Sequence, residues 1–360
     1  MSTSTTSDTT GAFDIPSIPP IWCPFEARMH PDADGVADHL VEWARRSLLI
    51  RTPSAAERFH RAGFGRFSAA VYPRATQLHL VAEWQGHNWL ADDQLDEGLT
   101  LADPKDRERV ADQLLSQLPE DLSWLHLPVR RGTAGASHAA SPLTAALSDL
   151  WHRTARPMSR AWRRRFVGHY RDFLAFTLLP HSARGRLTPP TLAAFVERRR
   201  QNSGCEMSFD LSAVATQTEV PAVVADSEPY RTVRRCANDV ISWTNDIFSV
   251  RKEMARGDED HLVAVLRRVH DTTWDEALAR AVDMVKHRTG DFVIACDDLR
   301  DMRRLYGVDD FGWRAVTESL TDLEGWISGS LEWHRWSPRY RLVETTETGS
   351  VPSYIEPHVV

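Results

Sequence analysis

The amino-acid sequence predicts an all-α protein with a single large helical domain. Apolar residues recur at helical spacing along most of the chain, and Val36, Leu40, Val41, Ala44 and Leu48 form the first such segment. Short polar stretches with helix-capping residues separate the apolar segments. No run of alternating apolar and polar residues leads into hairpin turn chemistry, and neither βαβ alternation nor an internal repeat is present. We therefore expect one domain that covers about residues 21–340.

The expected helices follow one another with few interruptions. Ser141 and Thr188 each precede a proline, which places a cap residue before a first-turn proline. Thr273 and Glu276 have the spacing of a capping box, and Pro180 is expected to end a long apolar helix. After the first segment, helical patterns cover residues 75–91, 106–118, 143–155, 158–179, 190–200, 229–256, 274–288, 291–305 and 313–335.

The two ends of the chain differ from this pattern. Residues 1–20 are rich in Ser, Thr and Pro and are expected to be disordered, and residues 341–360 are polar and irregular and are expected to form a C-terminal tail. The N-terminus lacks the basic and apolar regions of a signal peptide, and no window approaches 18 uninterrupted apolar residues. The four cysteines are scattered without a CxxC pair, as in reduced proteins. We expect a cytoplasmic protein without a membrane span.

Composition and missing motifs exclude several other classes of protein. The formal net charge of −7 argues against nucleic-acid binding, because such proteins usually present a basic face. The arginine runs 163–165 and 198–200 are typical of solvated helix faces in an acidic protein, with Arg199 as the exception discussed below. Residues 63–65 (Gly-Phe-Gly) lack a third glycine and a preceding strand, so we expect a loop there. The sequence contains no GxxxxGK[ST], HExxH or GxSxG motif.

An acidic cluster, Asp-Asp-Gln-Leu-Asp-Glu at residues 92–97, ends an apolar helical segment. Asp92 and Asp96 are one turn apart on the same helix face, with Cβ atoms about 6 Å apart. Magnesium prefers carboxylate oxygens together with substrate phosphates. The alternative is a solvated acidic helix end, but the apolar residues upstream, Trp84 and Trp89 among them, favour carboxylates that face a cleft.

A second polar cluster lies in the expected helix 229–256. Asn245, Ser249 and Glu253 are spaced four residues apart, so they lie on one face of the helix over a rise of about 12 Å. An amide oxygen, a hydroxyl and a carboxylate are three hard oxygen donors, and they are suitable ligands for one magnesium ion. The alternative is an ordinary polar helix stripe, although Asn and Ser are weak helix formers in mid-helix.

Taken together, the two clusters resemble the motifs of the class I terpene synthases, the bacterial single-domain terpene cyclases. DDQLDE at 92–97 resembles their DDxxD(E) motif, and NDIFSVRKE at 245–253 resembles their NDxxSxxxE motif. Lys252 occupies the position of the lysine that usually precedes the glutamate. Arg199, upstream of the second cluster, matches the diphosphate-sensing arginine, and Arg339-Tyr340 resembles the C-terminal arginine–tyrosine pair. These four matches occur in the order of the family.

The resemblance implies the class I terpenoid synthase helical bundle, which encloses a central active-site cavity. It also implies a carbon–oxygen lyase that ionises an isoprenyl diphosphate, with farnesyl diphosphate and a sesquiterpene product favoured, and cyclises the carbocation. Three Mg²⁺ ions are the cofactors of the family, and homodimers are compatible with the group. The metal ligands implied by the resemblance are Asp92, Asp96, Asn245, Ser249 and Glu253. The diphosphate-binding residues implied by it are Arg199, Lys252, Arg339 and Tyr340.

The resemblance extends to two further groups of residues. Asn202 and Ser203 match the linker and effector positions, which couple diphosphate sensing to the reactive end of the substrate, although Asp or Thr is more usual at position 202. Aromatic faces attract a carbocation by about 0.5–2 kcal/mol each and offer no nucleophile. Trp89 and Trp333 resemble pocket-lining positions. Looser candidates for the pocket wall are Phe64, Phe67, Trp84 and Phe248.

A second DDxxD string at Asp297–Asp301 raises the alternative of a chain-elongating prenyltransferase, which resembles this family in fold and carries two such motifs. We interpret it as surface acid, because Arg300, Arg303 and Arg304 can neutralise it at helical spacing. No DxDD motif supports protonation-initiated cyclisation. Two further hypotheses stay open: a diterpene cyclase that uses geranylgeranyl diphosphate, and a helical binding protein whose acidic motifs face solvent.

Overall fold

The computed structural model describes residues 17–97, 104–121, 141–177, 191–255, 258–337, 340, 354–356 and 359, with Asp96, Glu97, Pro104, Phe176, Thr177 and Ala255 as backbone only. All regular elements in these ranges are helices, which confirms the all-α prediction. They are α1 (Ala33–Arg46), α2 (Pro53–Ala62), α3 (Phe64–Val71), α4 (Leu78–Glu97), α5 (Pro104–Leu115), α6 (Pro142–Ala155), α7 (Arg160–Thr177), α9 (Leu192–Asn202), α10 (Cys205–Thr216), α11 (Ala222–Ala225), α12 (Glu228–Ala255), α13 (Leu262–His270), α14 (Trp274–Asp301), the 3₁₀ helix η3 (Met302–Leu305) and α15 (Asp310–Trp336).

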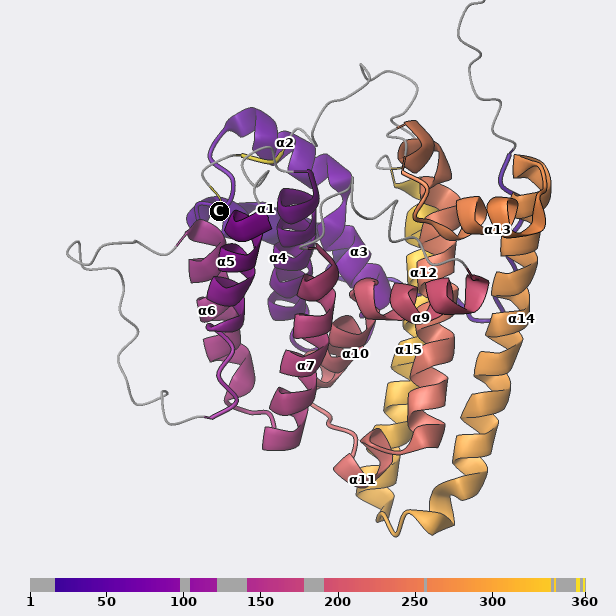
Figure 1. The fold of residues 1–360 in the computed structure, drawn as a ribbon. Helices are drawn as coiled ribbons and strands as arrows, with labels where there is room; N and C mark the ends of the chain where they lie inside the picture. Colours follow the sequence, from indigo (N-terminus) through magenta and orange to yellow (C-terminus); the bar gives the residue numbers. More distant parts are fainter. Residues whose placement is uncertain are drawn as a thin grey trace, which may run out of the picture.

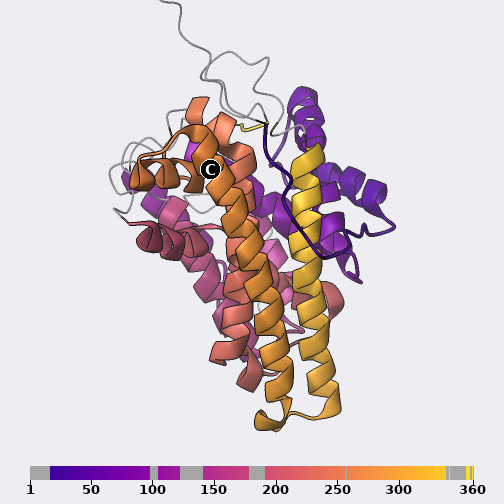
Figure 2. The same ribbon diagram turned by 90° about the vertical axis from the view of Figure 1, so that its right-hand side faces the viewer.

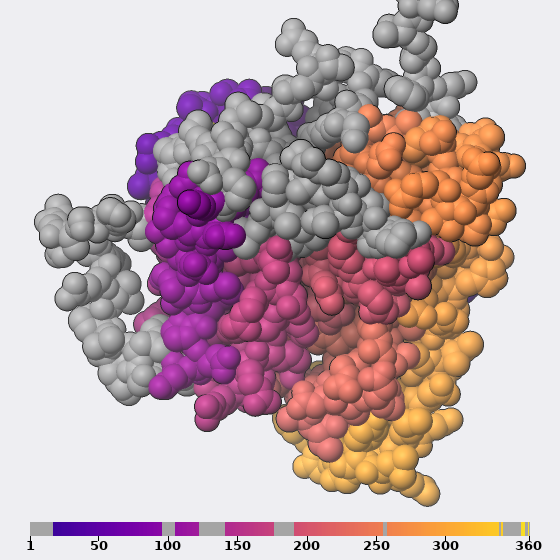
Figure 3. All heavy atoms as spheres, viewed as in Figure 1, coloured from indigo at the N-terminus to yellow at the C-terminus, as the bar shows by residue number. Residues whose placement is uncertain are grey.

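The helices form two groups that meet at α3, α9 and α10 (Figure 1). The long helices α12, α14 and α15 run side by side, and α14 and α15 are joined through η3 at one end (Figure 2). On the opposite side lie α4, α5, α6 and α7, and α7 packs against α9 where the two groups adjoin (Figure 3). This arrangement brings α4 and α12, which carry the two predicted metal-binding clusters, to facing sides of the bundle interior.

Local capping chemistry explains several helix boundaries. Ser141 accepts a hydrogen bond from Thr144 N at 3.3 Å and begins α6, and Thr273 forms the expected capping box with Glu276 at the start of α14. Both predictions are confirmed. α9 begins after Thr191, whose hydroxyl caps the helix. The predicted features at Thr188 and Pro180, and residues 1–16 of the N-terminal segment, lie outside the described residues.

The segment around Gly63 differs from the prediction of a loop. Gly63 takes a left-handed conformation (φ +79°), ends α2 and at the same time begins α3. A Cβ on Gly65 would lie 2.5 Å from the Cα of Ala37, so the missing side chain allows α3 to pack closely on α1. Residues 64–71 are therefore helical. The pattern was too short for helical periodicity to distinguish it from a turn.

A second difference concerns α14, which continues through residues 289–290, where the sequence predicts a break between two helices. Its buried face includes Val285, Thr289, Phe292, Cys296 and Leu299, so the apolar stripe runs unbroken past Gly290. Nothing lies within 4 Å of the position that a Cβ on Gly290 would take. A glycine in mid-helix lowers helix propensity, but packing of the stripe against α12 and α13 outweighs that cost.

The arginine runs are only in part the solvated faces that the sequence predicts, since Arg164 is exposed but the other five arginines are buried or half-buried. Arg163 is buried and donates to the carbonyl oxygens of Glu120 and Met158. Arg200 donates two hydrogen bonds of 2.7 Å to the buried carboxylate of Asp239. In each case the partner lies on a segment distant in sequence or in a helix cap. Helical spacing alone therefore did not indicate that these arginines are paired.

The described residues of the C-terminal tail pack against the domain. The ring of Tyr354 is buried beside Phe59 and Phe64, with centroid distances of 5.9 and 6.0 Å. Its hydroxyl donates to the buried carboxylate of Asp93, next to the first acidic cluster. Glu356 accepts hydrogen bonds from the backbone N–H of Arg51 and of Thr52, just before α2.

Within the described residues, none of the helices combines the length and the apolar character that crossing a membrane requires.

Candidate active site

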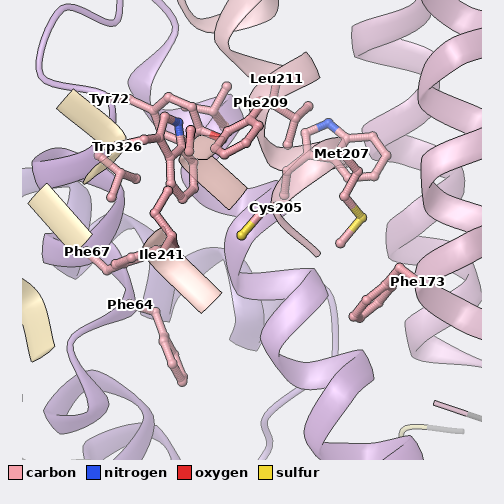
Figure 4. Packing of buried hydrophobic residues seen from close by; sticks show 14 of the residues in the cluster. Phe64, Phe67, Tyr72, Phe173, Cys205, Met207, Phe209, Leu211, Ile241 and Trp326 are labelled. Atoms are coloured by element: carbon pink, nitrogen blue, oxygen red, sulfur yellow. The ribbon is translucent and has the colours of Figure 1, made fainter. Parts of the chain in front are cut away.

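A cavity of about 230 Å³ lies inside the bundle between α4 and α12. Figure 4 shows part of its apolar wall, to which Phe67, Phe173, Met207, Ile241 and Trp326 contribute, each from a different helix. Most of the site residues predicted from the sequence line this one cavity. They are Phe67, Trp89, Asp92, Arg199, Asn202, Ser203, Asn245, Ser249, Glu253 and Trp333.

The α4 side of the cavity carries a stripe in which each side chain lies three or four residues from another member; its residues are Gln85, Asn88, Trp89 and Asp92. This spacing keeps them on one face of the helix. Asp93, one position further, is absent from the cavity wall and instead accepts the hydrogen bond from Tyr354. The backbone of α4 continues through Asp96, whose side chain lies outside the described part of the chain.

The α12 side carries a matching stripe, in which Ser242, Asn245, Ser249 and Glu253 line the cavity. The Asn245 amide is held from two directions. Its Nδ2 donates to the hydroxyl of Tyr340 at 2.9 Å, and its Oδ1 accepts from Arg199 Nη2 at 3.4 Å. Oxygen donors of the kind that hard divalent cations prefer therefore line the cavity from two separate helices.

Arg199 is a residue of α9, and its side chain contacts α12. Its Nε donates to Asp246 Oδ1 at 3.1 Å, and its Nη1 donates to Asn202 Oδ1 at 3.1 Å. Burial disfavours the charged form of Arg199, but the neighbouring carboxylate of Asp246 outweighs this effect and raises the pKa of the guanidinium. The side chain therefore keeps its charge inside the cavity wall.

The turn between α9 and α10 fixes the two residues at the predicted linker and effector positions. Ser203 donates to Asn238 Oδ1 at 2.8 Å and accepts from Cys205 N at 3.1 Å. Gly204 has φ +71°, which lets the chain reverse between the two helices. Asn202, through its bond to Arg199, connects this turn to the guanidinium.

The aromatic part of the wall is a cluster of three rings. The Trp333 ring centroid lies 4.8 Å from that of Phe67 and 5.7 Å from that of Trp89, and Phe67 meets Trp89 edge-on. Phe64 stacks on Trp89 at 5.2 Å. Such ring faces can stabilise a positive charge in the cavity without attacking it.

Comparison with known proteins identifies the family. The family model described as terpene synthase family 2, C-terminal metal binding, matches residues 84–291, which is more than half of the chain and contains both clusters.

The chain belongs to the terpene synthase family. Pentalenene synthase of Streptomyces avermitilis is 31% identical over 345 residues, which cover 92% of this chain and 96% of that protein. R-linalool synthase of Streptomyces clavuligerus is 31% identical over 324 residues (88% and 92%), and (+)-T-muurolol synthase of Roseiflexus castenholzii is 28% identical over 319 residues (88% and 92%). The sequence-based identification is therefore confirmed.

Solved structures agree with this assignment. A cucumene synthase variant superposes with a TM-score of 0.74 at 27% identity, covering 88% of this chain and 99% of that one. Hedycaryol synthase in complex with HEPES gives 0.73 at 25% identity, covering 89% and 98%. The terpenoid synthase fold is thus confirmed. Membership makes the chain a diphosphate-cleaving lyase with a region that binds divalent metal ions, and its substrates are isoprenyl diphosphates.

Two predicted residues of this terpene synthase that the structure describes, Lys252 and Tyr340, do not line the cavity. Lys252 directly precedes Glu253 on α12, with Nζ 3.7 Å from Glu253 Oε1. Tyr340 is buried behind Asn245 and stacks on His334. Arg339 and the Asp96 side chain lie outside the described residues.

Three of the looser aromatic candidates, Phe64, Trp84 and Phe248, do not line the cavity, and Phe64 packs against Trp89. Trp84 is fully buried, donates to Thr154 Oγ1 at 2.8 Å and packs on Phe166. Phe248 lies beside Tyr340, with 6.4 Å between ring centroids. Position near a motif therefore did not suffice to place a tryptophan or phenylalanine in the pocket.

Several cavity residues of the terpene synthase were missed from the sequence. Asp246 accepts from both Arg199 and the backbone N–H of Leu262, and His334 lies against Asn245. Their only signal was adjacency, since Asp246 follows Asn245 and His334 follows Trp333. Asn88 and Gln85 lie one and two turns before Asp92, so helical spacing from the acidic cluster was the available signal.

The second DDxxD string lies on the outside of α14. Asp297, Asp298 and Asp301 are exposed, and Arg300 Nη1 is 2.7 Å from Asp297 Oδ1. Arg303 pairs with Asp310 instead. The interpretation of this string as surface acid is confirmed.

Proposed function

We propose that this terpene synthase converts farnesyl diphosphate into a cyclic C15 terpene and releases diphosphate. The observation that carries the proposal is one cavity lined both by oxygen donors from α4 and α12 and by aromatic rings. Pentalenene, pristinol and (+)-T-muurolol synthases are among the relatives, and the last is named as cyclising (2E,6E)-farnesyl diphosphate.

Three Mg²⁺ ions are the proposed cofactors. Asp92, together with Asp96, would hold two of them, and the α12 stripe Asn245, Ser249 and Glu253 would hold the third. Every group in this set is an oxygen donor, which fits a hard cation that keeps part of its coordination sphere for phosphate oxygens. When bound, Mg²⁺ supplies positive charge that stabilises the departing diphosphate.

Four residues are proposed to bind the diphosphate: Arg199, Lys252, Arg339 and Tyr340. The planar Arg199 guanidinium offers two parallel N–H groups to an anion, whereas Lys252 offers a mobile point charge. Arg199 now bonds Asp246, Asn202 and Asn245. Because Asn202 also begins the turn to Ser203, we propose that these two residues pass a change at Arg199 to the hydrocarbon part of the cavity.

The aromatic wall is proposed to hold the carbocation. Trp89, Trp333 and Phe67 present ring faces and edges that attract positive charge, by about 0.5–2 kcal/mol per favourable contact. Their close packing also limits the number of water molecules beside the reactive chain. This part of the site therefore contributes to the choice of product.

The test is incubation of the purified protein with Mg²⁺ and geranyl, farnesyl or geranylgeranyl diphosphate, followed by gas chromatography–mass spectrometry. Three substrate lengths are needed because an R-linalool synthase is also among the relatives. We expect a C15 product from farnesyl diphosphate and none after chelation of the metal. The absence of terpene products and of released diphosphate with all three substrates would reject the proposal.

Two competing functions are separated by small additions to the same assay. A chain-elongating prenyltransferase would form longer diphosphates when isopentenyl diphosphate is supplied. A binding protein would show the same melting temperature with and without Mg²⁺ and diphosphate, whereas ligands that bind the native state raise it.

A further inference from the structure

Tyr354, in the C-terminal tail, contacts the acidic end of α4. Its side chain is buried, and its hydroxyl donates a hydrogen bond to the carboxylate of Asp93, which is only 2% exposed. A carboxylate buried to this degree is costly unless donors satisfy it, and a hydrogen bond to a charged oxygen is stronger than one between neutral groups. Tyr354 therefore supplies a specific donor to the residue that directly follows Asp92.

Contacts with α2 and α3 hold this tyrosine in place independently of α4. Its ring meets the rings of Phe59 and Phe64 edge-on, with centroid distances of 5.9 and 6.0 Å. Two residues further on, Glu356 accepts hydrogen bonds from the backbone N–H groups of Arg51, at 2.6 Å, and of Thr52, at 3.2 Å. The hydroxyl group is therefore presented to α4 from a fixed position.

The two neighbouring carboxylates of α4 have different surroundings. Consecutive residues of a helix point about 100° apart, and of this pair Asp92 lines the cavity whereas Asp93 does not. Both groups are carboxylates and both attract a divalent cation. The hydrogen bond from Tyr354 holds the carboxylate of Asp93 outside the cavity wall. Asp92 is then the member of the pair that faces the cavity.

We propose that Tyr354 is a positioning residue for the metal site. Its hydrogen bond to Asp93 fixes the end of α4, so that Asp92 presents its carboxylate to Mg²⁺. This inference rests on the proposed Mg²⁺ site of this terpene synthase. Tyr354 is not part of the cavity wall and acts through Asp93. Its ring reaches the same helix by a second route, because Phe64 stacks on Trp89 at 5.2 Å.

The experiment compares Tyr354→Phe with the wild type in calorimetric titrations of Mg²⁺ with inorganic diphosphate present. The variant keeps the ring and removes only the hydroxyl. The Mg²⁺ concentration for half-saturation should rise about tenfold, as for other groups that orient metal ligands. Turnover of farnesyl diphosphate should recover at high Mg²⁺, and the product pattern should not change, because the ring still packs on Phe64. A purely structural role would lower the melting temperature without changing the Mg²⁺ requirement.

A double-mutant cycle tests whether the hydroxyl acts through Asp93. Asp93→Ala removes the acceptor, so the addition of Tyr354→Phe to this variant should not raise the half-saturating Mg²⁺ concentration further. The same tenfold rise in both backgrounds would mean that the hydroxyl acts by another route, and it would overturn the proposal.

Tyr230→Phe is the matched control. Tyr230 is also buried, and its hydroxyl lies 2.6 Å from Ser319 Oγ, in a contact between α12 and α15. It does not line the cavity. This variant removes a buried hydroxyl of the same kind and should leave the Mg²⁺ requirement unchanged. A rise equal to that of Tyr354→Phe would attribute the effect to a general loss of packing and would also overturn the proposal.

The outcomes separate this inference from the proposed function. Mg²⁺ binding that Tyr354→Phe leaves unchanged overturns the inference, and the proposed cyclisation stands if the wild type forms a C15 product. The expected shift in a protein that forms no terpene rejects the proposed reaction and leaves the positioning role standing. If the wild type binds no Mg²⁺ in the presence of diphosphate, both the metal site and the inference are overturned.

Discussion

The ring of His334 determines which way the amide of Asn245 faces. His334 Nδ1 lies 2.7 Å from the Ser330 carbonyl, which can only accept, so this nitrogen carries the proton. Nε2 lies 3.1 Å from Asn245 Nδ2 and is the acceptor of this contact, because an amide nitrogen only donates. The hydroxyl of Tyr340 accepts from the same Nδ2. Both contacts turn Oδ1, the atom that can bind a metal, toward Arg199.

Replacement of His334 by Phe should therefore weaken metal binding more than substrate binding. The change keeps a ring beside Tyr340 but removes the acceptor that orients the Asn245 amide. We expect the Mg²⁺ concentration for half-maximal activity to rise on the order of tenfold, as for other groups that orient metal ligands, with a smaller change in KM. Calorimetric titration of Mg²⁺ with diphosphate present gives a readout independent of turnover. His60→Phe, an exposed histidine on α2, is the control.

The α12 stripe and the exposed DDxxD string on α14 provide a matched test of the proposed metal ligands. Glu253→Gln or Asn245→Leu should lower turnover on the order of a hundredfold or more and abolish the rise in melting temperature with Mg²⁺ and diphosphate. Asp297→Asn and Asp298→Asn change the exposed string on α14 and should do neither. Equal losses of turnover in the α12 variants and in the α14 variants would mean that the overall negative charge of the protein, and not metal binding by these residues, causes the effect.

Arg199→Lys should retain much of the fold but lose turnover, because an ammonium group cannot reproduce the planar fork that bonds Asp246 and Asn202. Arg199→Ala should also lower stability, since it leaves the carboxylate of Asp246 buried without its cation. Steady-state kinetics and thermal melting separate the two effects. The exposed Arg164 on α7 is the control position, and Arg164→Ala should match the wild type in both measurements.

Asp210 should make the largest single contribution to acid sensitivity that the described ion pairs indicate. It bonds Arg165, His169 and Arg234. Burial opposes its ionisation, but the positive charges of Arg234, His169 and Arg165 outweigh burial and hold the pKa of its carboxyl well below the usual range. Since the folded-state pKa is depressed, the contribution to stability is present above the unfolded-state value of about 3.9 and is lost as the pH falls below it.

Asp210→Asn is accordingly expected to lower the free energy of unfolding at pH 7 by about 3–5 kcal/mol, because it leaves Arg234 buried and unpaired by this carboxylate. The difference from the wild type should shrink below pH 4. Urea denaturation at several pH values measures both. Asp291→Asn disrupts an exposed pair with Arg288 and should cost less than about 1 kcal/mol. A small, pH-independent effect of Asp210→Asn would contradict the prediction.

The sequence predicted those parts of the site in which all residues belong to one helix. Asp92 on α4 and Asn245, Ser249 and Glu253 on α12 share faces because helical spacing dictates it, and apolar neighbours showed which face is buried. Neither helical spacing nor apolar neighbours indicated which residues of different helices are in contact. The bond from Tyr354 to Asp93 joins positions 261 residues apart, and nothing in either segment indicates the other.

The same distinction explains the fold. Long amphipathic helices such as α12 and α15 were predicted because their apolar stripes run over many turns. Helices of two or three turns, α2, α3, α10 and α13, were not, because a few residues of periodicity cannot be separated from a loop. For α3, close packing of Gly65 on Ala37 is a tertiary property that local sequence does not encode.

Asp246 connects three helices through one carboxylate. Its Oδ1 binds the guanidinium of Arg199 on α9, and its Oδ2 accepts the backbone N–H of Leu262 at 2.9 Å, at the start of α13. An anion that draws the guanidinium away changes the charge that this amide experiences. The hydrogen-exchange rate of the Leu262 amide therefore reports whether an anion occupies the cavity. This rate can be measured without any chemical turnover.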